Sequence, residues 1–267
     1  MRMGSRPLFV FAVLYVIFLY APAMLLPLFS FNDATMIAFP LKGFTLRWYE
    51  GLLGNAQLMA AFKNSLVVAL CAAAISTCIG ICGAKAVTHR KLRGGKAAVG
   101  LIMLPLVVPS IVVGISLLML ARHVLDIELS LWTVGIGHVL LCVPFSMLVM
   151  MSRLEGFDRS LEEASLDLGQ SRWGTFRRVT LPLALPGIVA SFLLSFTVSL
   201  DEFVLAFFLA GNETTLPIYI FSQLRFPSRL PDVLALGSCI LLGSCLLVLF
   251  AEWLRRRGIQ SAFSRGI

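Results

Sequence analysis

Two adjacent carboxylates, Asp201 and Glu202, interrupt a stretch of the chain that is otherwise free of charge over about 25 residues. An ionised carboxylate is costly against lipid, so at least one of the two is expected to face a water-filled cavity or a protein partner. Successive helical residues point about 100° apart, which predicts different tasks for the pair. Asp201 would line a polar path and attract a cation, while Glu202 would hold the helix against a neighbour. The alternative is that both make structural hydrogen bonds at a subunit interface.

His138 is a further polar candidate for such a path, and it also lies in an apolar stretch. The alternative is a packed, hydrogen-bonded histidine, since a metal site would need further ligands nearby. The six cysteines also fall in apolar stretches and are interpreted as small packing residues. Cys78 and Cys82 lie one helical turn apart, but no histidine or second cysteine pair completes a metal site. We therefore predict neither a metal centre nor a disulfide framework.

Membrane-spanning helices must position these side chains. Of the 267 residues, 58% are hydrophobic and only 13% are charged, and the mean hydropathy is +0.91. A span needs roughly twenty apolar residues. Prolines within the apolar stretches, including Pro105 and Pro109, predict kinked helices. The sequence thus predicts an all-α membrane protein with a single domain over residues 1–267 and six transmembrane helices, near residues 8–31, 65–84, 97–121, 131–152, 184–210 and 233–251.

The distribution of basic residues predicts the orientation. Placing the N-terminus inside puts most of the 22 lysine and arginine residues on the inner side, where cytoplasmic segments carry their excess. Both termini are then cytoplasmic, and the net charge of +8 needs no nucleic-acid partner. Arg2 and Arg6, with Ala21-Pro22-Ala23 further on, also imitate a secretory signal. The apolar run continues through Phe29, which is too long for a signal core and favours a span.

The cytoplasmic loop near residues 153–183 carries many of the charges. Ser160-Leu161-Glu162-Glu163 has the pattern of a capping box, so a helix is predicted to begin there. Gly169 is predicted to end it, and Ser171 to cap a second short helix. We call residues 160–179 the elbow. Apolar and small residues recur along it at helical spacing, namely Leu161, Ala164, Ser165 and Leu168, then Trp173, Phe176 and Val179. Such a face needs a protein partner, or else lies among lipid headgroups.

The spacing within this loop resembles a known motif. Glu163-Ala164-Ser165, three residues, Gly169, nine residues and then Val179-Thr180-Leu181-Pro182 are similar to the EAA loop of the permeases of binding-protein-dependent ABC importers. Ser165 replaces the second alanine of that motif, and Val179 replaces an isoleucine. The resemblance implies that the loop inserts into a groove of an ATPase subunit. It implies coupling roles for the residues Glu163, Ala164, Ser165, Gly169, Trp173, Leu181 and Pro182.

Three further segments resemble the spermidine/putrescine permeases within that family: Phe44–Tyr49, Leu193–Phe203 and Thr215–Pro217. The resemblance implies a type I ABC importer permease fold in a bacterial inner membrane. It implies as partners a second, similar permease in a heterodimer, a dimer of ABC ATPase subunits and a soluble substrate-binding protein in the periplasm or outside the cell. ATP and Mg²⁺ would be bound by the ATPase, so no cofactor is expected in this chain. The implied solute is a polyamine, or otherwise another small solute.

Motifs of other functional classes are missing from the sequence. The nearest approach to a phosphate-binding loop, Gly94-Gly95-Lys96-Ala97, lacks both the leading spacing and the hydroxyl residue. We find no nucleophile elbow and no zinc-protease motif, so the chain is not expected to be an enzyme. Two alternatives stay open: a secondary transporter that acts alone, which would usually show internal repeats, and a structural scaffold subunit.

Overall fold

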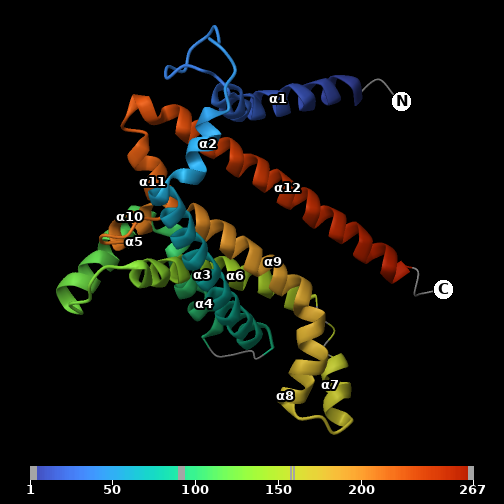
Figure 1. Ribbon diagram of the computed structural model, residues 1–267. Helices are drawn as coiled ribbons and strands as arrows, with labels where there is room; N and C mark the ends of the chain where they lie inside the picture. Colours follow the sequence, from blue (N-terminus) through green and yellow to red (C-terminus); the bar gives the residue numbers. More distant parts are fainter. Residues whose placement is uncertain (1–4, 90–93, 157, 159, 264–267) are drawn as a thin grey trace. The chain divides into compact units, whose positions relative to one another are not determined.

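A computed structural model describes residues 5–89, 94–156, 158 and 160–263, and the described residues form helices without a strand. Figure 1 shows their arrangement along the chain. Arg2 and the inner-loop residues 90–93, which contribute to the predicted orientation, lie outside the described residues. The α-helices are α1 (Ser5–Ser30), α2 (Arg47–Gly54), α3 (Ala56–His89), α4 (Gly95–Val107), α5 (Ser110–Met119), α6 (Leu131–Glu155), α7 (Ser160–Asp167), α8 (Arg172–Thr175), α9 (Leu181–Asp201), α10 (Val204–Leu209), α11 (Leu216–Gln223) and α12 (Leu230–Phe263). Two π-helices, η1 (Leu120–Val124) and η2 (Phe176–Thr180), and the 3-10 helix η3 (Pro227–Arg229) complete the set.

Five of the described helices are long and apolar enough to cross a membrane, and a sixth span results if one bent pair counts as a single span. That pair corrects the prediction of one continuous helix at residues 97–121. The chain bends by 100° between Val107 and Ser110. Pro109 has no N–H to donate, and its ring forces Val108 into an extended conformation with φ −80° and ψ 131°. Pro109 therefore ends α4, and the bend at this break is larger than a kink.

The fifth span also differs from the prediction of residues 184–210. Helical structure runs from Arg172 through η2 into α9 and ends at Asp201. Glu202 leaves the helical conformation, with φ −72° and ψ 109°, and a new short helix, α10, starts at Val204. The acidic pair therefore marks the end of the spanning helix and does not lie within it.

Contacts divide the chain into two units, residues 1–58 with 220–267 and residues 59–219. In the first unit, α12 packs against both α1 and α2. The connection that follows α1 is held by Asn32, whose buried side chain accepts a hydrogen bond from the Lys42 amide at 3.0 Å. Trp48 donates its indole N–H to the Asn32 carbonyl at 3.0 Å, which fixes the start of α2. Buried polar groups thus find partners within this connection.

The second unit is organised around α6, which packs against α9, α10 and α4. One buried apolar cluster lies where α3, α6 and α10 meet, and it contains Val68, Val134, Leu141, Leu205, Ala206, Leu209 and Ala210. Another lies where the predicted cytoplasmic ends of α3 and α6 meet the start of α9, and it contains Ala84, Met147, Met150, Leu154 and Ala184. In Figure 1, α7 and α8 lie side by side beyond the start of α9. The elbow therefore lies next to the cluster that contains Met147 and Ala184, within the second unit.

Candidate functional site

The first helix of the elbow begins at Ser160, as predicted, but its cap is Asp158 and not the serine. Asp158 Oδ1 accepts a hydrogen bond from the Ser160 amide at 3.0 Å, and the Asp158 carbonyl accepts one from the Leu161 amide. This backbone hydrogen bond lowers the pKa of the Asp158 carboxyl, because it favours the charged form. The Asp158 carboxylate lies two residues before the helix and accepts from its first free amide group. Ser160 is therefore not needed as the cap and is itself the first helical residue.

The turn between α7 and α8 follows the predicted signals. Gly169 has a φ of +85°, a left-handed conformation that favours glycine, and it ends the first helix. Ser171 Oγ accepts a hydrogen bond from the Gly174 amide at 3.1 Å and so caps the second helix. Ser165 and Thr175 share a hydrogen bond of 3.0 Å between their hydroxyl groups, which ties the two helices together. The turn is thus held by local hydrogen bonds on its inner side.

The outer side of the elbow leaves apolar surface uncovered. A groove of about 490 Å³ is lined by Leu161, Ala164, Ser165, Leu168, Gln170, Arg178, Val179, Pro182 and Leu183. The Leu168 side chain is 84% exposed and that of Trp173 is 70% exposed. Trp173 stacks on Phe176 with ring centroids 5.5 Å apart, and neither ring lines the groove, whereas Val179 does. The predicted apolar face is therefore present in part: its first four residues and Val179 line the groove, whereas Trp173 and Phe176 do not.

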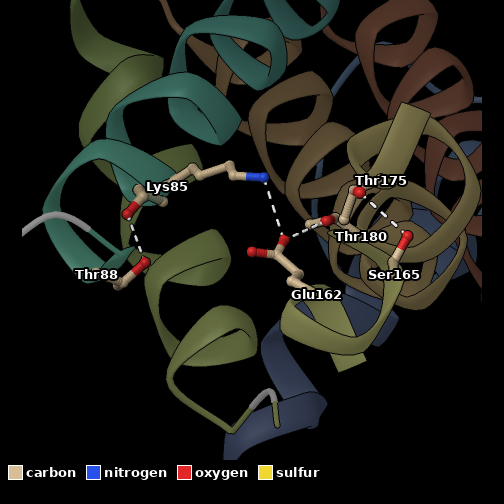
Figure 2. Close-up of polar contacts among 7 residues, drawn as sticks. Lys85, Thr88, Glu162, Ser165, Thr175 and Thr180 are labelled. Carbon is tan, nitrogen blue, oxygen red and sulfur yellow. Dashed lines mark hydrogen bonds and ion pairs between the residues drawn. The ribbon is translucent and has the colours of Figure 1, made fainter. Parts of the chain in front are cut away.

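One acidic side chain connects the elbow to a helix far away in the sequence (Figure 2). Glu162 Oε1 accepts a hydrogen bond from Lys85 Nζ at 3.2 Å and another from the Thr180 hydroxyl. Lys85 also lies over the ring of Phe176, 4.8 Å from its centroid. The family motif directs attention to Glu163, whose side chain is exposed, whereas Glu162 carries the contact with α3 and has no role in the motif. No local signal pairs two residues that are 77 positions apart.

A basic residue at the end of α6 makes a second connection to the start of α9. Arg153 donates a hydrogen bond to the Leu183 carbonyl at 3.0 Å. Its aliphatic stem packs on Gly187, where an added Cβ would come within 2.8 Å of the Arg153 side chain. Arg153 therefore joins α6 to α9 at a close crossing, next to the point where the elbow continues into α9.

The two carboxylates of the predicted path take different positions. Asp201 is the last residue of α9, and its side chain is exposed. Glu202 is partly buried, and its Oε1 accepts a hydrogen bond from the Leu205 amide at 3.1 Å, which caps the first turn of α10. One carboxylate is thus engaged with the backbone while the other faces outward.

His138 lies in a row of polar groups between α6 and α9, which we call the polar seam. It consists of His138, Cys142 and Ser146 on α6 and Ser199, Ser195 and Ser191 on α9. His138 Nδ1 and Ser199 Oγ are 2.7 Å apart, the Cys142 thiol lies 3.4 Å from the Ser195 carbonyl, and the hydroxyl groups of Ser146 and Ser191 are 2.6 Å apart. Within the described part of the chain, His138 Nε2 and Ser195 Oγ are buried without a hydrogen-bond partner. His138 is 2% exposed, so it is a packed, hydrogen-bonded histidine.

The described histidine, cysteine and acidic residues do not form a metal site. Among the residues described, no group of three His, Cys, Asp or Glu side chains could hold a metal ion. Cys142 is buried in the polar seam, whereas Cys78 and Cys82 are exposed on α3. The candidate site residues therefore form two separate groups, one at the elbow and one along α9 and α6.

Comparison with known proteins places the chain in a family. Residues 76–259 match the family described as "Binding-protein-dependent transport system inner membrane component". The chain is 37% identical over 243 residues to the putrescine transport system permease protein PotI of Escherichia coli (strain K12), a match that covers 88% of this chain and 85% of that protein. It is 36% identical over 257 residues to the spermidine/putrescine transport system permease protein PotC of Haemophilus influenzae, which covers 96% of this chain and 98% of that protein.

A solved structure has the same fold. A chain of a bacterial ABC transporter involved in the import of the acidic polysaccharide alginate aligns with a TM-score of 0.72, covering 96% of this chain and 98% of that one, at 18% sequence identity. At that identity the likeness concerns the fold alone. Because the family match spans more than half of the chain and the relatives match over most of their length, this protein belongs to the family of binding-protein-dependent transport system inner membrane components.

Proposed function

We propose that this chain is the permease subunit of an ATP-driven importer in a bacterial inner membrane, with both termini in the cytoplasm. The observation that carries the proposal is the elbow. Its turn is capped and its inner side is hydrogen-bonded, yet the exposed side chain of Leu168 lines an apolar groove, and the Trp173 side chain is exposed as well. A preorganised surface of this kind binds a protein partner with little loss of conformational entropy.

That partner is proposed to be a dimer of ABC ATPase subunits, which would bind ATP and Mg²⁺. The sequence has no phosphate-binding loop of its own, so ATP hydrolysis requires another chain. The residues assigned to the contact are Glu163, Ala164, Ser165, Gly169, Trp173, Leu181 and Pro182. A second, similar permease would complete the membrane part as a heterodimer. A soluble binding protein would deliver the solute, in line with the description of the family.

The proposed solute is a polyamine such as putrescine or spermidine. Support comes from the transport functions that the names of the two relatives state. Asp201 supplies the matching charge, since its exposed carboxylate ends the spanning helix α9. Two opposite unit charges 4 Å apart attract by about 1 kcal/mol in water and about 4 kcal/mol at partial desolvation. Glu202 is assigned a structural role, because its carboxylate caps α10.

The test is transport by the reconstituted complex. Proteoliposomes that contain this chain, its second permease and the ATPase are expected to accumulate labelled putrescine only when ATP and the binding protein are both present. Vesicles that contain this chain alone are expected to take up nothing under a proton or sodium gradient. Uptake by the chain alone would support a secondary transporter instead. A binding protein that carries an anion or a neutral sugar would refute the polyamine but leave the importer intact.

A further inference from the structure

The contact between Lys85 and Glu162 joins two parts of the chain that have no short covalent connection. The elbow is continuous with α9 and follows α6 closely, whereas α3 leads into α4 and is separated from the elbow by the whole of α6. Lys85 lies near the end of α3, and Glu162 lies in the first turn of α7. The ion pair of 3.2 Å is therefore a direct bond between the elbow and α3.

Both members of this pair are fixed from more than one side. Glu162 also accepts the hydroxyl of Thr180, and Lys85 also lies over the Phe176 ring. Their side chains are only 15% and 31% exposed, respectively. A lysine in an exposed pair loses much of its attraction to side-chain entropy and solvent screening. Here the aromatic ring and the partial burial reduce both losses, because they restrict the lysine and exclude water.

The residue beside Lys85 is packed in the apolar interior. Ala84, next to Lys85, is fully buried in the apolar cluster with Met147 and Ala184. The Thr88 hydroxyl bonds to the Ala84 carbonyl at 2.8 Å, and this bond is drawn in Figure 2. The end of α3 is thus packed against α6 and α9 through Ala84, so a displacement of Glu162 would act on a helix that is in contact with both.

We propose that Lys85 and Glu162 are positioning residues that transmit the movement of the elbow to α3. The elbow is connected to α6 and α9 through the backbone, and Arg153 joins these two helices to each other through the Leu183 carbonyl. With the ion pair in place, three helices respond to one displacement. This inference rests on the proposed function, because it requires that an ATPase moves the elbow.

The test compares uptake of labelled putrescine per ATP hydrolysed in proteoliposomes of the complete complex. Lys85→Met removes the charge and keeps the length of the side chain. Glu162→Gln removes the charge and keeps an acceptor for Thr180. Both variants are expected to assemble with the ATPase in the parental amount and to lower uptake per ATP by about two- to fivefold, the range expected of an ion pair worth up to about 1 kcal/mol. Lys85→Arg preserves the charge and is expected to retain the parental ratio.

A matched control is Glu155→Gln, which neutralises an exposed carboxylate at the end of α6. It is expected to leave uptake per ATP unchanged. A parental ratio in both Lys85→Met and Glu162→Gln would overturn the inference, as would an equal loss in Glu155→Gln. Failure of the two neutral variants to assemble would make the pair an assembly contact and would also overturn it. Absence of ATP-driven uptake in the parent complex would refute the proposed function and this inference with it, before any variant is compared.

Discussion

The elbow and the polar seam use polar and apolar groups in opposite ways. In the polar seam, hydroxyl, thiol and imidazole groups turn toward one another between α6 and α9, with Ser146 and Ser191 2.6 Å apart in a buried environment. In the elbow, the polar groups close the inner side while leucine and tryptophan side chains stay exposed. A region that buries its side chains between two helices contributes to the packing of the fold, even though His138 Nε2 and Ser195 Oγ lack partners among the described residues. A region that leaves apolar surface open is suited to a partner. Substitutions in the two regions should therefore affect different measurements.

The largest effect is expected at the turn of the elbow. Gly169→Asp places a side chain at a φ of +85° and adds a charge beside the groove. The left-handed conformation is unfavourable for residues with a Cβ, and the added charge lies beside the groove proposed to bind the ATPase, so ATP-driven uptake is expected to fall about tenfold. Immunoblots of membrane fractions are expected to show parental insertion. The control, Gly156→Ala, changes a glycine with a φ of −81° in the same loop and should keep uptake. Full uptake by Gly169→Asp would remove the distinction between the two regions.

The opposite pattern is expected in the polar seam. Ser146→Val removes the 2.6 Å partner of the buried Ser191 hydroxyl and leaves it only the longer contact of 3.5 Å with the Thr77 hydroxyl. The loss of one such hydrogen bond costs about 1 kcal/mol. The Tm of the purified protein in detergent should fall, while the amount of ATPase that it retains at low temperature should not change. Ser152→Val, at an exposed position of α6, serves as the control. An unaltered Tm in Ser146→Val would show that the seam contributes little to stability.

Asp201 and Glu202 are neighbours, but we assign one to transport and the other to stability. Asp201→Asn is expected to reduce putrescine uptake several-fold at a normal yield of complex, because the exposed carboxylate is assigned to the path. Glu202→Gln weakens the cap on Leu205 and should lower stability by about 1 kcal/mol with little loss of uptake. Complex yield, Tm and uptake would be measured together for both variants. Reversed phenotypes would mean that the two roles are assigned the wrong way round.

The smallest effect is expected at the start of α7. The pKa of Asp158 is lowered by the hydrogen bond from the Ser160 amide, so the cap is charged at neutral pH and weakens only as the pH falls below the ordinary aspartate value of 3.8. Hydrogen exchange at the amides of Ser160 and Leu161 should therefore show constant protection between pH 6 and pH 8. Asp158→Ala should remove part of that protection at every pH. Equal protection in the variant would show that another group caps the helix.

Local signals were sufficient to predict much of the elbow. Gly169 and Ser171 act through their own backbone neighbourhood, so their roles as helix end and cap are visible in the sequence and are confirmed. The cap at the start was assigned to Ser160, although Asp158 fills it, because several side chains within one turn can reach the same amide groups. The hydropathy also predicted the apolar helices, since a span depends on composition over a long stretch.

Features that depend on distant contacts were not predictable in the same way. The pair of Lys85 and Glu162 forms only when α3 and α7 meet, and neither residue stands out in its own segment. Pro109 indicated a kink, but a bend of 100° depends on how α5 packs against α10. The end of α9 at Asp201 was likewise hidden, because the apolar residues of α10 continue the same hydropathy signal across the break.

The most direct test of the elbow as an ATPase-docking surface is retention of the ATPase by an affinity-tagged form of this chain. Leu168→Glu places a charge on the exposed apolar face of the elbow. The control, Leu53→Glu, places a charge on α2, which belongs to a segment predicted to lie outside the membrane. The two leucine side chains are almost equally exposed, at 84% for Leu168 and 82% for Leu53. The parent and Leu53→Glu are expected to retain equal amounts of ATPase, and Leu168→Glu is expected to lose most of it. Equal retention by all three proteins would contradict the docking role of the elbow.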